Sequence, residues 1–210
     1  AQNLPEGGGP VLELGSGAGF LNYYVPGLKT SEVFFCDLVD IVLDGCELPL
    51  KEASLKGIAF VDVLHHLPRS REFFREAARC IRTGGRIVMI EPWITAWSKI
   101  VYKRLHHEPL DTGAKEWNFP ASGPLSGANS ALPWIIFSRD RETFERDYPQ
   151  WTVRCIEVGM PFRYLLSGGV SLRSLMPGWS FPFWARIEKY LGPFNNRLGM
   201  FAGIVIERLE

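Results

Sequence analysis

The feature that most constrains the fold is the stretch "VLELGSGAGF" at Val11 to Phe20, in which an apolar run leads directly into three glycines at alternate positions. A glycine turn after a strand lets the backbone come close to a ligand, because glycine has no Cβ and adopts positive φ at low cost. Free backbone N–H groups in such a turn favour an anionic group. The same turn also allows tight strand-to-helix packing, so both interpretations stay open for the motif alone.

Short apolar runs recur along the chain, and several do not alternate with polar residues, as is typical of strands buried on both faces. We predict strands at 10–14, 33–36, 40–43, 58–61, 86–90, 151–158 and 201–207. The clearest helix has Ser70 as a capping residue, an apolar stripe from Phe73 to Ile81, and Gly84-Gly85 at its end. This order predicts an α/β fold with a Rossmann-like, doubly wound, seven-stranded and mostly parallel sheet.

The length of 210 residues fits one domain, which we predict over 1–210 with the cofactor-binding half at 10–95. Two excursions, 96–150 and 159–199, leave the sheet after the fifth and sixth strands and are rich in aromatic residues, Pro and Gly. Loops this long inside a compact domain are usually functional, so we expect both to be lids over one edge of the sheet. The start "AQNLPEGGGP" leads at once into a core strand, which suggests that an upstream segment has been lost or cut away.

Charge is balanced, with 23 Lys and Arg against 23 Asp and Glu, so no whole-chain field attracts nucleic acid. The four cysteines lack the spacing of a zinc site or of a secreted disulfide framework. No apolar run approaches the ~18 to 20 residues that span a bilayer. We therefore expect a cytoplasmic protein without a nucleic-acid partner, and we find no feature that sets its oligomeric state.

Two isolated aspartates follow the glycine turn, at the ends of the next two predicted strands. Asp37 closes the second strand, where a carboxylate can accept hydrogen bonds from both hydroxyls of a ribose. Asp44 closes the third, where a second acceptor can meet an adenine amino group. Either aspartate alone is as well explained as a turn or cap residue. Both together, after a glycine turn, predict a nucleoside across the tips of the first three strands.

At this point the sequence resembles the class I S-adenosylmethionine-dependent methyltransferases, in particular the type 11 group. Matching elements run in order over about 10–95: the glycine turn, "FFCD", "DGCELPL" like the family's D-A-x-x-L-P-F, "DVLHHLP", and "RCIRTGGRIVMIEPW" like R-x-L-K-P-G-G-x-L-x-x-x-E-P. Beyond this range, "MFAGIVIERL" resembles the last strand of the family's sheet, which is antiparallel. The resemblance implies S-adenosyl-L-methionine as the cofactor.

The resemblance also implies eight cofactor-binding residues at the ends of the first four strands: Glu13, Gly15, Gly17, Asp37, Leu38, Asp44, Gly45 and Phe60. In that set the two glycines line the methionine and Glu13 supports their loop. Asp37 holds the ribose with Leu38 against the adenine, Asp44 and Gly45 read the adenine edge, and a backbone carbonyl near Phe60 meets the ammonium group. The link from Asp37 to Asp44 is too short for the family's second helix, which opens one side of this site.

All four histidines come as adjacent pairs. His65 and His66 follow the fourth strand, near the expected methyl group, and are the candidate catalytic residues, although a structural role is the commoner one for a histidine. Adjacent residues on a helix point ~100° apart, so only one of a pair readily faces a common site, and we expect no metal site. The candidate residues on the substrate side are Glu91, which alternatively braces a loop, Trp93, His106 and His107.

The excursions bear on the acceptor. In "AWSKIVYKRLHH" an apolar face with Trp97 and Ile100 lies largely opposite Lys99 and Lys103, which suits an anionic membrane surface or, more commonly, packing on its own domain. An aromatic cover favours a small hydrophobic or lipid-linked acceptor, although an ordinary lid completing the core is the commoner case. We predict methyl transfer to such a small molecule. Two alternatives remain: a non-catalytic cofactor-binding or membrane-associated scaffold, and an NAD-dependent oxidoreductase, against which Phe20 and Asp44 argue.

Overall fold

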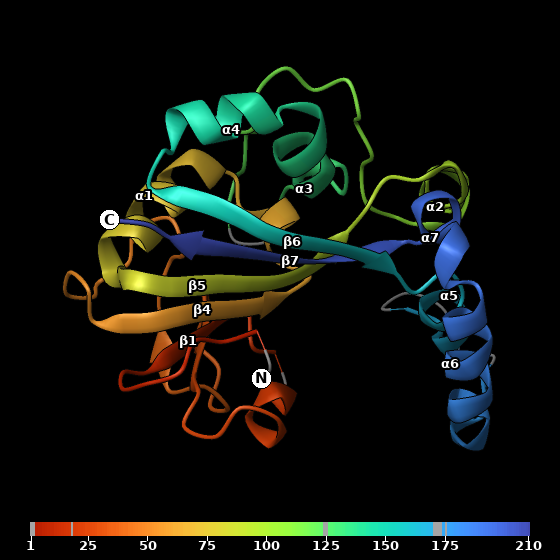
Figure 1. The fold of residues 1–210 in the computed structure, drawn as a ribbon, viewed down its shortest axis with the longest axis horizontal. Helices are drawn as coiled ribbons and strands as arrows, with labels where there is room; N and C mark the ends of the chain where they lie inside the picture. The colour runs from red at the N-terminus through yellow and green to blue at the C-terminus, as the bar shows by residue number, and fades with distance from the viewer. Residues whose placement is uncertain (1–2, 18, 124–125, 170–173, 175) are drawn as a thin grey trace.

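The computed structural model describes residues 3–17, 19–123, 126–169, 174 and 176–210, and its centre is a seven-stranded sheet in the order β3-β2-β1-β4-β5-β7-β6 (Figure 1). Its members are β1 (Val11–Leu14), β2 (Lys29–Glu32), β3 (Ile41–Val42), β4 (Leu55–Val61), β5 (Ile81–Pro92), β6 (Trp151–Gly159) and β7 (Phe201–Arg208). β1 to β5 pair in parallel, whereas β7 pairs antiparallel with both β5 and β6. The predicted fold class, including the antiparallel last strand, is confirmed.

The second strand does not lie where the sequence predicts it. β2 is the polar segment Lys29–Glu32, and the predicted strand at 33–36 is an irregular stretch in which the Phe35 side chain is 80% exposed. A polar strand can be buried here because its hydroxyls have partners: Ser31 Oγ donates to the Glu13 carbonyl at 2.6 Å, and Thr30 Oγ1 donates to Asp40 at 3.2 Å. The acidic residue that ends β2 is therefore Glu32 and not Asp37.

The predicted helix is present as α1 (Ser70–Cys80), with Phe73, Phe74 and Ala77 fully buried on its apolar stripe. Its ends differ from the prediction. Ser70 is the first helical residue rather than the cap, and its hydroxyl donates to the Trp117 carbonyl at 3.2 Å. The chain passes from the helix straight into β5, which includes the glycine pair expected to stop the helix.

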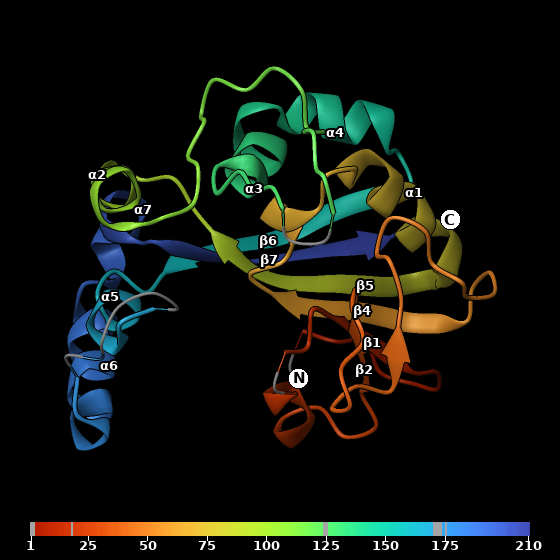
Figure 2. The ribbon, with the colours of Figure 1, turned by 180° about the vertical axis from the view of Figure 1, so that it is seen from behind.

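Helices cover one face of the sheet (Figures 1 and 2). They are α1, α3 (Leu132–Trp134), the π-helical turn η3 (Ile135–Arg139) and α4 (Arg141–Asp147). Aromatic side chains of this layer, such as Phe74, Phe137 and Phe144, pack edge to face in the main core. On the other face, the short helical turn η1 (Phe20–Tyr23) and the chain around it pack on β1 and β4 through Leu21, with Leu28 beside them.

A second group of helices lies at the carboxyl ends of the parallel strands, on the side of the molecule opposite α1 (Figure 1). We call it the helical appendage: α2 (Ala96–Leu105), α5 (Arg163–Ser167), η4 (Gly178–Ser180), α6 (Phe181–Tyr190), η5 (Gly192–Phe194) and α7 (Asn195–Leu198). Thr95 and Ser98 form a capping box at the start of α2. Val101 and Tyr102 of α2 pack on Met200 and Phe201. Within the described residues, no helix is both long and apolar enough to cross a membrane.

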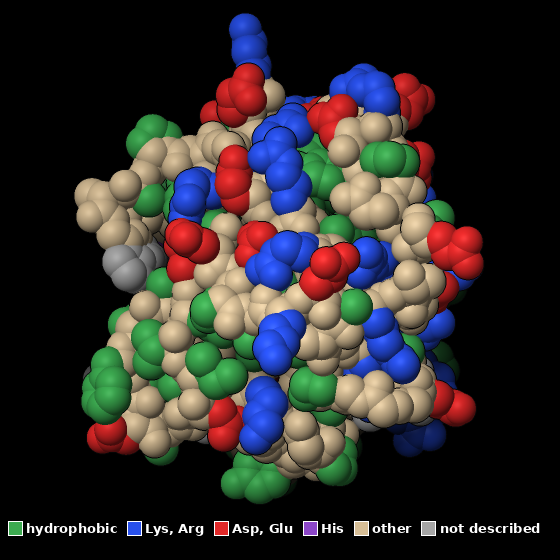
Figure 3. Space-filling view, turned by 90° about the vertical axis from the view of Figure 1, so that its left-hand side faces the viewer, with side chains coloured by type: hydrophobic (Ala, Val, Ile, Leu, Met, Phe, Trp, Pro, Cys, Tyr) green, Lys and Arg blue, Asp and Glu red, His purple; other side chains and the backbone are tan. Residues whose placement is uncertain are grey.

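The face at the amino ends of the parallel strands carries Lys and Arg side chains interspersed with Asp and Glu (Figure 3). Lys and Arg side chains follow one another down the middle of this face, with Asp and Glu side chains beside them.

Candidate active site

A cavity of about 580 Å³ lies at the carboxyl ends of the first four strands, the edge at which open α/β sheets bind ligands. Its strand-end wall is formed by Leu14, Gly15, Ser31, Glu32, Val33, Phe34, Leu43, Asp44, Gly45, Asp62 and Val63. The remaining lining residues are His66, Leu67, Pro68 and Arg69, which follow β4, and His107, Glu108, Ala121 and Gly123, which come from the first predicted excursion. No described residue of 159–199 is among them. That predicted lid range also contains residues 170–173 and 175, which lie outside the described residues.

The glycine turn is shaped by two different requirements. Gly15 has a φ of 62°, and a Cβ there would lie 2.6 Å from Val63 Cγ2, so both conformation and space demand glycine. Gly17 also has positive φ, and its N–H donates to Glu32 Oε1 at 2.7 Å, which ties the turn to β2. Glu13 is buried beneath the turn, and burial raises the pKa of its carboxyl, although Ser16 acts in the opposite direction.

Glu32 is the acidic side chain that the second strand brings to the cavity. It is 8% exposed and lines the cavity, as does Val33, which follows it. Asp37 and Leu38 are exposed and absent from the lining. The predicted position of Asp37 at the end of the second strand is thus wrong, because the strand is four residues earlier in the chain than its apolar neighbours indicate. Glu32 was not among the predicted site residues.

Asp44 and Gly45 both line the cavity beyond β3. Asp44 accepts a hydrogen bond from the Cys46 N–H at 2.8 Å, and its other oxygen lies 2.9 Å from Arg69 Nη2. These contacts fix the Asp44 carboxylate at the rim of the cavity. The predicted contact of Asp44 and Gly45 with an adenine edge stays a prediction.

Phe60 is buried inside β4 and is not part of the lining. At this strand end the cavity wall is Asp62 and Val63 instead. Asp62 has a φ of 64°, uncommon for a residue with a side chain. Burial raises the pKa of the Asp62 carboxyl to about 6, against the lowering effect of nearby His65.

His65 is fully buried between two carboxylates. Its Nδ1 lies 2.8 Å from Glu91 Oε2, and its Nε2 lies 3.2 Å from Glu108 Oε2. Burial alone would lower the pKa of this imidazole, but Glu108 and Glu91 outweigh burial and raise it to about 10. His65 itself does not line the cavity.

Glu91 and Trp93, predicted on the substrate side, are not brought to the cavity. Glu91 Oε1 accepts hydrogen bonds from the backbone N–H groups of Val63 at 2.8 Å and Leu64 at 2.7 Å. Glu91 therefore braces the turn after β4, which is the structural alternative considered for it. Trp93 belongs to the main core, and its N–H donates to the Met200 carbonyl at 2.8 Å.

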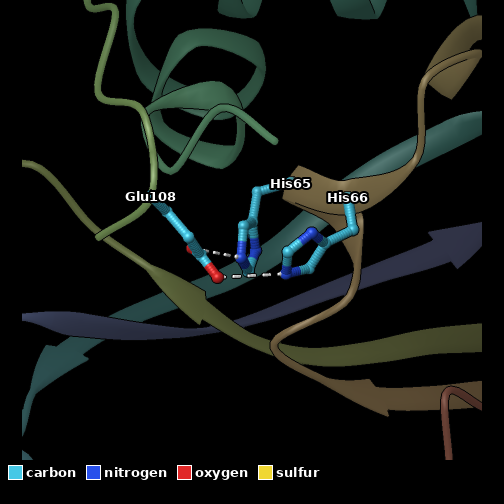
Figure 4. Close-up of side chains that lie close together, drawn as sticks. All are labelled: His65, His66 and Glu108. Carbon is cyan, nitrogen blue, oxygen red and sulfur yellow. Dashed lines mark ion pairs between the residues drawn. The ribbon is translucent and has the colours of Figure 1, made fainter. Parts of the chain in front are cut away.

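Glu108 joins both histidines of the first pair (Figure 4). His66 Nε2 lies 3.3 Å from Glu108 Oε1, while His65 faces the other oxygen. The prediction that only one histidine of a pair faces a common site is wrong here, because the pair sits in the short 3₁₀ turn η2 (Leu64–His66) and the two carboxylate oxygens span both rings. Although burial alone would raise the pKa of Glu108, His65 and His66 hold it well below its usual range. Glu108 was missed, and its only sequence signal is its place directly after the second pair.

The second pair of histidines divides between two environments. His107 lines the cavity, with its Nε2 3.9 Å from Glu108 Oε1. His106 turns to the appendage: its Nε2 lies 3.2 Å from the Tyr164 hydroxyl, and its Nδ1 accepts from the Glu108 N–H at 3.3 Å. Burial lowers the pKa of His106. Of the two, His107 is the one that a bound molecule can reach.

With this geometry in place, the chain can be compared with known proteins. Residues 12–89, from β1 to within β5, match a protein-family model described as a methyltransferase domain. This match covers the first half of the sheet, and the whole chain has the fold of the class I S-adenosylmethionine-dependent methyltransferases. S-adenosylmethionine is the cofactor that the matched domain implies.

Solved structures share the fold at low sequence identity. A chain of the complex that contains the Haloferax volcanii Trm112 methyltransferase activator has a TM-score of 0.56 at 13% identity, over 100% of this chain and 86% of that one. The geranyl diphosphate C-methyltransferase of Streptomyces coelicolor A3(2), with Mg²⁺, geranyl diphosphate and S-adenosyl-L-homocysteine, has 0.52 at 14%, over 99% and 76%. A methyltransferase of Methanosarcina mazei has 0.51 at 11%, over 99% and 96%. No curated protein sequence matches this chain.

Proposed function

We propose that this chain transfers the methyl group of S-adenosylmethionine to a small acceptor, which binds where residues 106–123 and 126–131 close over the strand ends. One observation carries the proposal: the glycine turn, Glu32 and Asp44 share a single cavity with His107 and Glu108 of this segment. The first group suits a nucleoside and its amino-acid tail, and the second suits a polar acceptor group. We call the described residues 106–123 and 126–131 the lid.

The cavity fits the cofactor by the chemistry of its strand-end wall. Gly15, which tolerates no Cβ, would line the methionine part, with Asp62 in place of Phe60 near its ammonium group. Glu32 would accept hydrogen bonds from the ribose hydroxyls in place of Asp37. Asp44 and the Gly45 backbone would meet the adenine edge.

S-adenosylmethionine supplies an already activated methyl group, so the protein's task is to hold the acceptor ~3 to 3.5 Å from it, in line, and to exclude water. In this proposal the lid excludes water from the cavity. It is fastened over the cavity by the Asn129 N–H donating to the His65 carbonyl at 2.9 Å and the Phe119 N–H donating to the Pro68 carbonyl at 3.0 Å. Of the two predicted catalytic histidines, His66 reaches the cavity and can contact the acceptor, whereas buried His65 acts through its neighbours.

We infer a hydrophobic or lipid-linked acceptor, reached from a membrane surface by the helical appendage. Trp179 is 83% exposed and Tyr190 74%, and Phe183 is also exposed. Arg186 and Lys189 lie on α6, between or beside these aromatic residues. Exposed aromatic side chains mixed with cations are typical of helices that rest on anionic membranes. A fold neighbour that acts on geranyl diphosphate supports an acceptor of this kind.

The assignment of Glu32 is tested by calorimetric titration of S-adenosylhomocysteine into the wild-type chain, Glu32→Gln and Asp37→Asn. Loss of a charge-assisted hydrogen bond costs about 1.5 to 3 kcal/mol, so the Glu32 variant should bind at least about tenfold more weakly. Asp37→Asn should bind like the wild type. The reverse ranking would restore Asp37 as the ribose ligand. Equal binding by all three chains would mean that neither Glu32 nor Asp37 binds the ribose.

Turnover separates the proposal from its two alternatives. The chain is incubated with labelled S-adenosylmethionine and a fractionated lysate, and we expect label in a small, apolar fraction. Cofactor binding without label in any fraction would favour the non-catalytic scaffold. Thermal stabilisation by NAD but not by S-adenosylhomocysteine would favour an oxidoreductase.

A further inference from the structure

Three side chains aim their ligand atoms at one point in the cavity wall. His65 Nε2, His66 Nε2 and a carboxylate oxygen of Glu108 all lie within 4.8 Å of one another. The two nitrogens are 3.2 and 3.3 Å from Glu108 oxygens. Ligands about 2.0 to 2.1 Å from a tetrahedral zinc ion are about 3.4 Å from each other, so these separations fit the edges of a coordination shell. We propose that His65, His66 and Glu108 bind a divalent transition-metal ion.

Each of these three side chains is held from its far side by a group that suits a metal ligand. His65 Nδ1 meets Glu91 Oε2 at 2.8 Å, and His66 Nδ1 meets the Gly127 carbonyl at 3.4 Å. Both partners accept, so each Nδ1 donates to them, and each Nε2 is left facing Glu108, where a metal ion would displace any proton that Nε2 carries. The Ser130 hydroxyl donates to Glu108 Oε2 at 3.1 Å. Histidines that bind metals are usually oriented by such a second hydrogen bond, often to a carboxylate.

The state of His65 Nε2 favours a metal over a simple ion pair. This atom is fully buried and makes no hydrogen bond within the described residues, although Glu108 is only 3.2 Å away. Burial of an unsatisfied polar atom is costly, and a metal ion between the two groups would satisfy it. A divalent ion would also balance the charges of the buried Glu91 and the partly exposed Glu108. The three side chains of Figure 4 come together from two separate segments, the turn after β4 and the chain after α2.

The surroundings leave room for further ligands. Asp62 Oδ1 lies 3.9 Å from His65 Nε2, and His107 Nε2 lies 3.9 Å from Glu108 Oε1. A site with both imidazole and carboxylate donors suits zinc, iron, manganese or cobalt better than it suits magnesium. His66, Glu108, Asp62 and His107 all line the cavity, so the open positions of the ion would face it. The use of the ion to hold an acceptor oxygen rests on the proposed function, whereas the binding of the ion does not.

The test is calorimetric titration of Zn²⁺, Mn²⁺ and Mg²⁺ into the EDTA-treated chain, without cofactor. It compares the wild type with Glu108→Gln and His66→Gln, and with Glu116→Gln as the matched control, because Glu116 is an exposed glutamate of the same segment. We expect one transition-metal ion per chain in the wild type and the control. The Glu108 and His66 variants should bind at least about tenfold more weakly.

Two further measurements distinguish loss of metal binding from loss of folding, and neither requires methyl transfer. Co²⁺ in the wild type should give visible ligand-field absorption without the intense bands of thiolate ligands. Melting temperatures in EDTA show whether each variant is folded before it is titrated. Equal metal affinity in all four chains would place the ion at other residues, and thiolate bands would assign it to cysteines; either result would overturn the proposal. No saturable binding to the wild type would leave a histidine–glutamate ion pair, whether or not Glu32 binds the cofactor.

Discussion

The two walls of the cavity are built in different ways. The strand-end wall, with Gly15, Glu32 and Asp44, follows three neighbouring parallel strands and lies within the residues that match the methyltransferase family. The lid, with His107 and Glu108, lies beyond that match. The wall proposed for the cofactor is therefore set by the sheet, which brings strand ends together wherever the fold recurs. The wall proposed for the acceptor is set by an excursion outside the matched residues.

The bonds that hold the walls differ accordingly. The strand-end wall is tied into the sheet ladder and by buried contacts such as Ser31 Oγ donating to the Glu13 carbonyl at 2.6 Å. The lid is fastened by a few hydrogen bonds centred on Asn129, whose side chain joins Asp111 and whose N–H reaches the turn after β4. Substitutions in the first wall should thus lower the stability of the whole fold, and those in the second mainly the closure of the cavity.

The largest effect is expected at Gly15. Alanine there would place a methyl group 2.6 Å from Val63 Cγ2 at a φ of 62°. Left-handed backbone costs an alanine about 1 to 2 kcal/mol, and overpacking adds about 1 to 3, so Gly15→Ala should lose about 2 to 5 kcal/mol of unfolding free energy. S-adenosylhomocysteine binding should fall with it.

The control at Gly17 separates space from conformation. A Cβ at Gly17 has no neighbour within 4 Å, although φ is 51°. Gly17→Ala should therefore cost only the backbone term, about 1 to 2 kcal/mol, in urea unfolding. Equal losses of unfolding free energy in the two variants would mean that the Val63 side chain moves aside and that the turn is not tightly packed.

Particular residues show which parts of this contrast the sequence could predict. β1 and β7 are apolar runs and lie close to their predicted bounds, whereas β5 contains the predicted run 86–90 but begins at Ile81, before the glycine pair expected to precede it. β2 was misplaced because its hydroxyls are satisfied by partners distant in sequence, while the apolar residues after it are exposed. Hydrophobic periodicity detects strands whose apolar side chains are buried. It cannot detect a polar strand that is buried because its side chains are hydrogen-bonded.

Glu108 could not have been found from periodicity either. It follows an α-helix in an irregular segment, and its partners lie on a different element, after β4. Only the closing of the lid brings these groups together. The adjacent histidines were noticed, but the 100° rule for helices does not apply to a single 3₁₀ turn followed by loop.

An intermediate effect is expected in the lid at Asn129. Its side chain accepts from the Asp111 N–H at 3.0 Å and the Ala131 N–H at 3.1 Å, and donates to the Asp111 carbonyl at 3.0 Å. Asn129→Ala removes these bonds and should cost about 1 to 2 kcal/mol. Hydrogen exchange should show faster opening across the lid, with the strand-end wall unchanged. Lys115→Ala, at an exposed position in the same lid, is the control. Equal loosening of β1 and β2 would mean that the two walls are one cooperative unit.

The smallest effect on the fold is expected in the helical appendage, which lies outside both walls. Trp179 and Phe183 are exposed, so replacing them by serine should change the unfolding free energy by no more than about 0.5 kcal/mol and leave cofactor affinity intact. Co-sedimentation with anionic vesicles should nevertheless fall, since the apolar side chains that would enter the headgroup region are gone. A matched change at Tyr23, an exposed aromatic residue on η1, should leave vesicle binding unaltered. If the Tyr23 variant lost as much vesicle binding as the appendage variant, the membrane surface would lie beside the strand-end wall instead, and the acceptor would approach from the cofactor side.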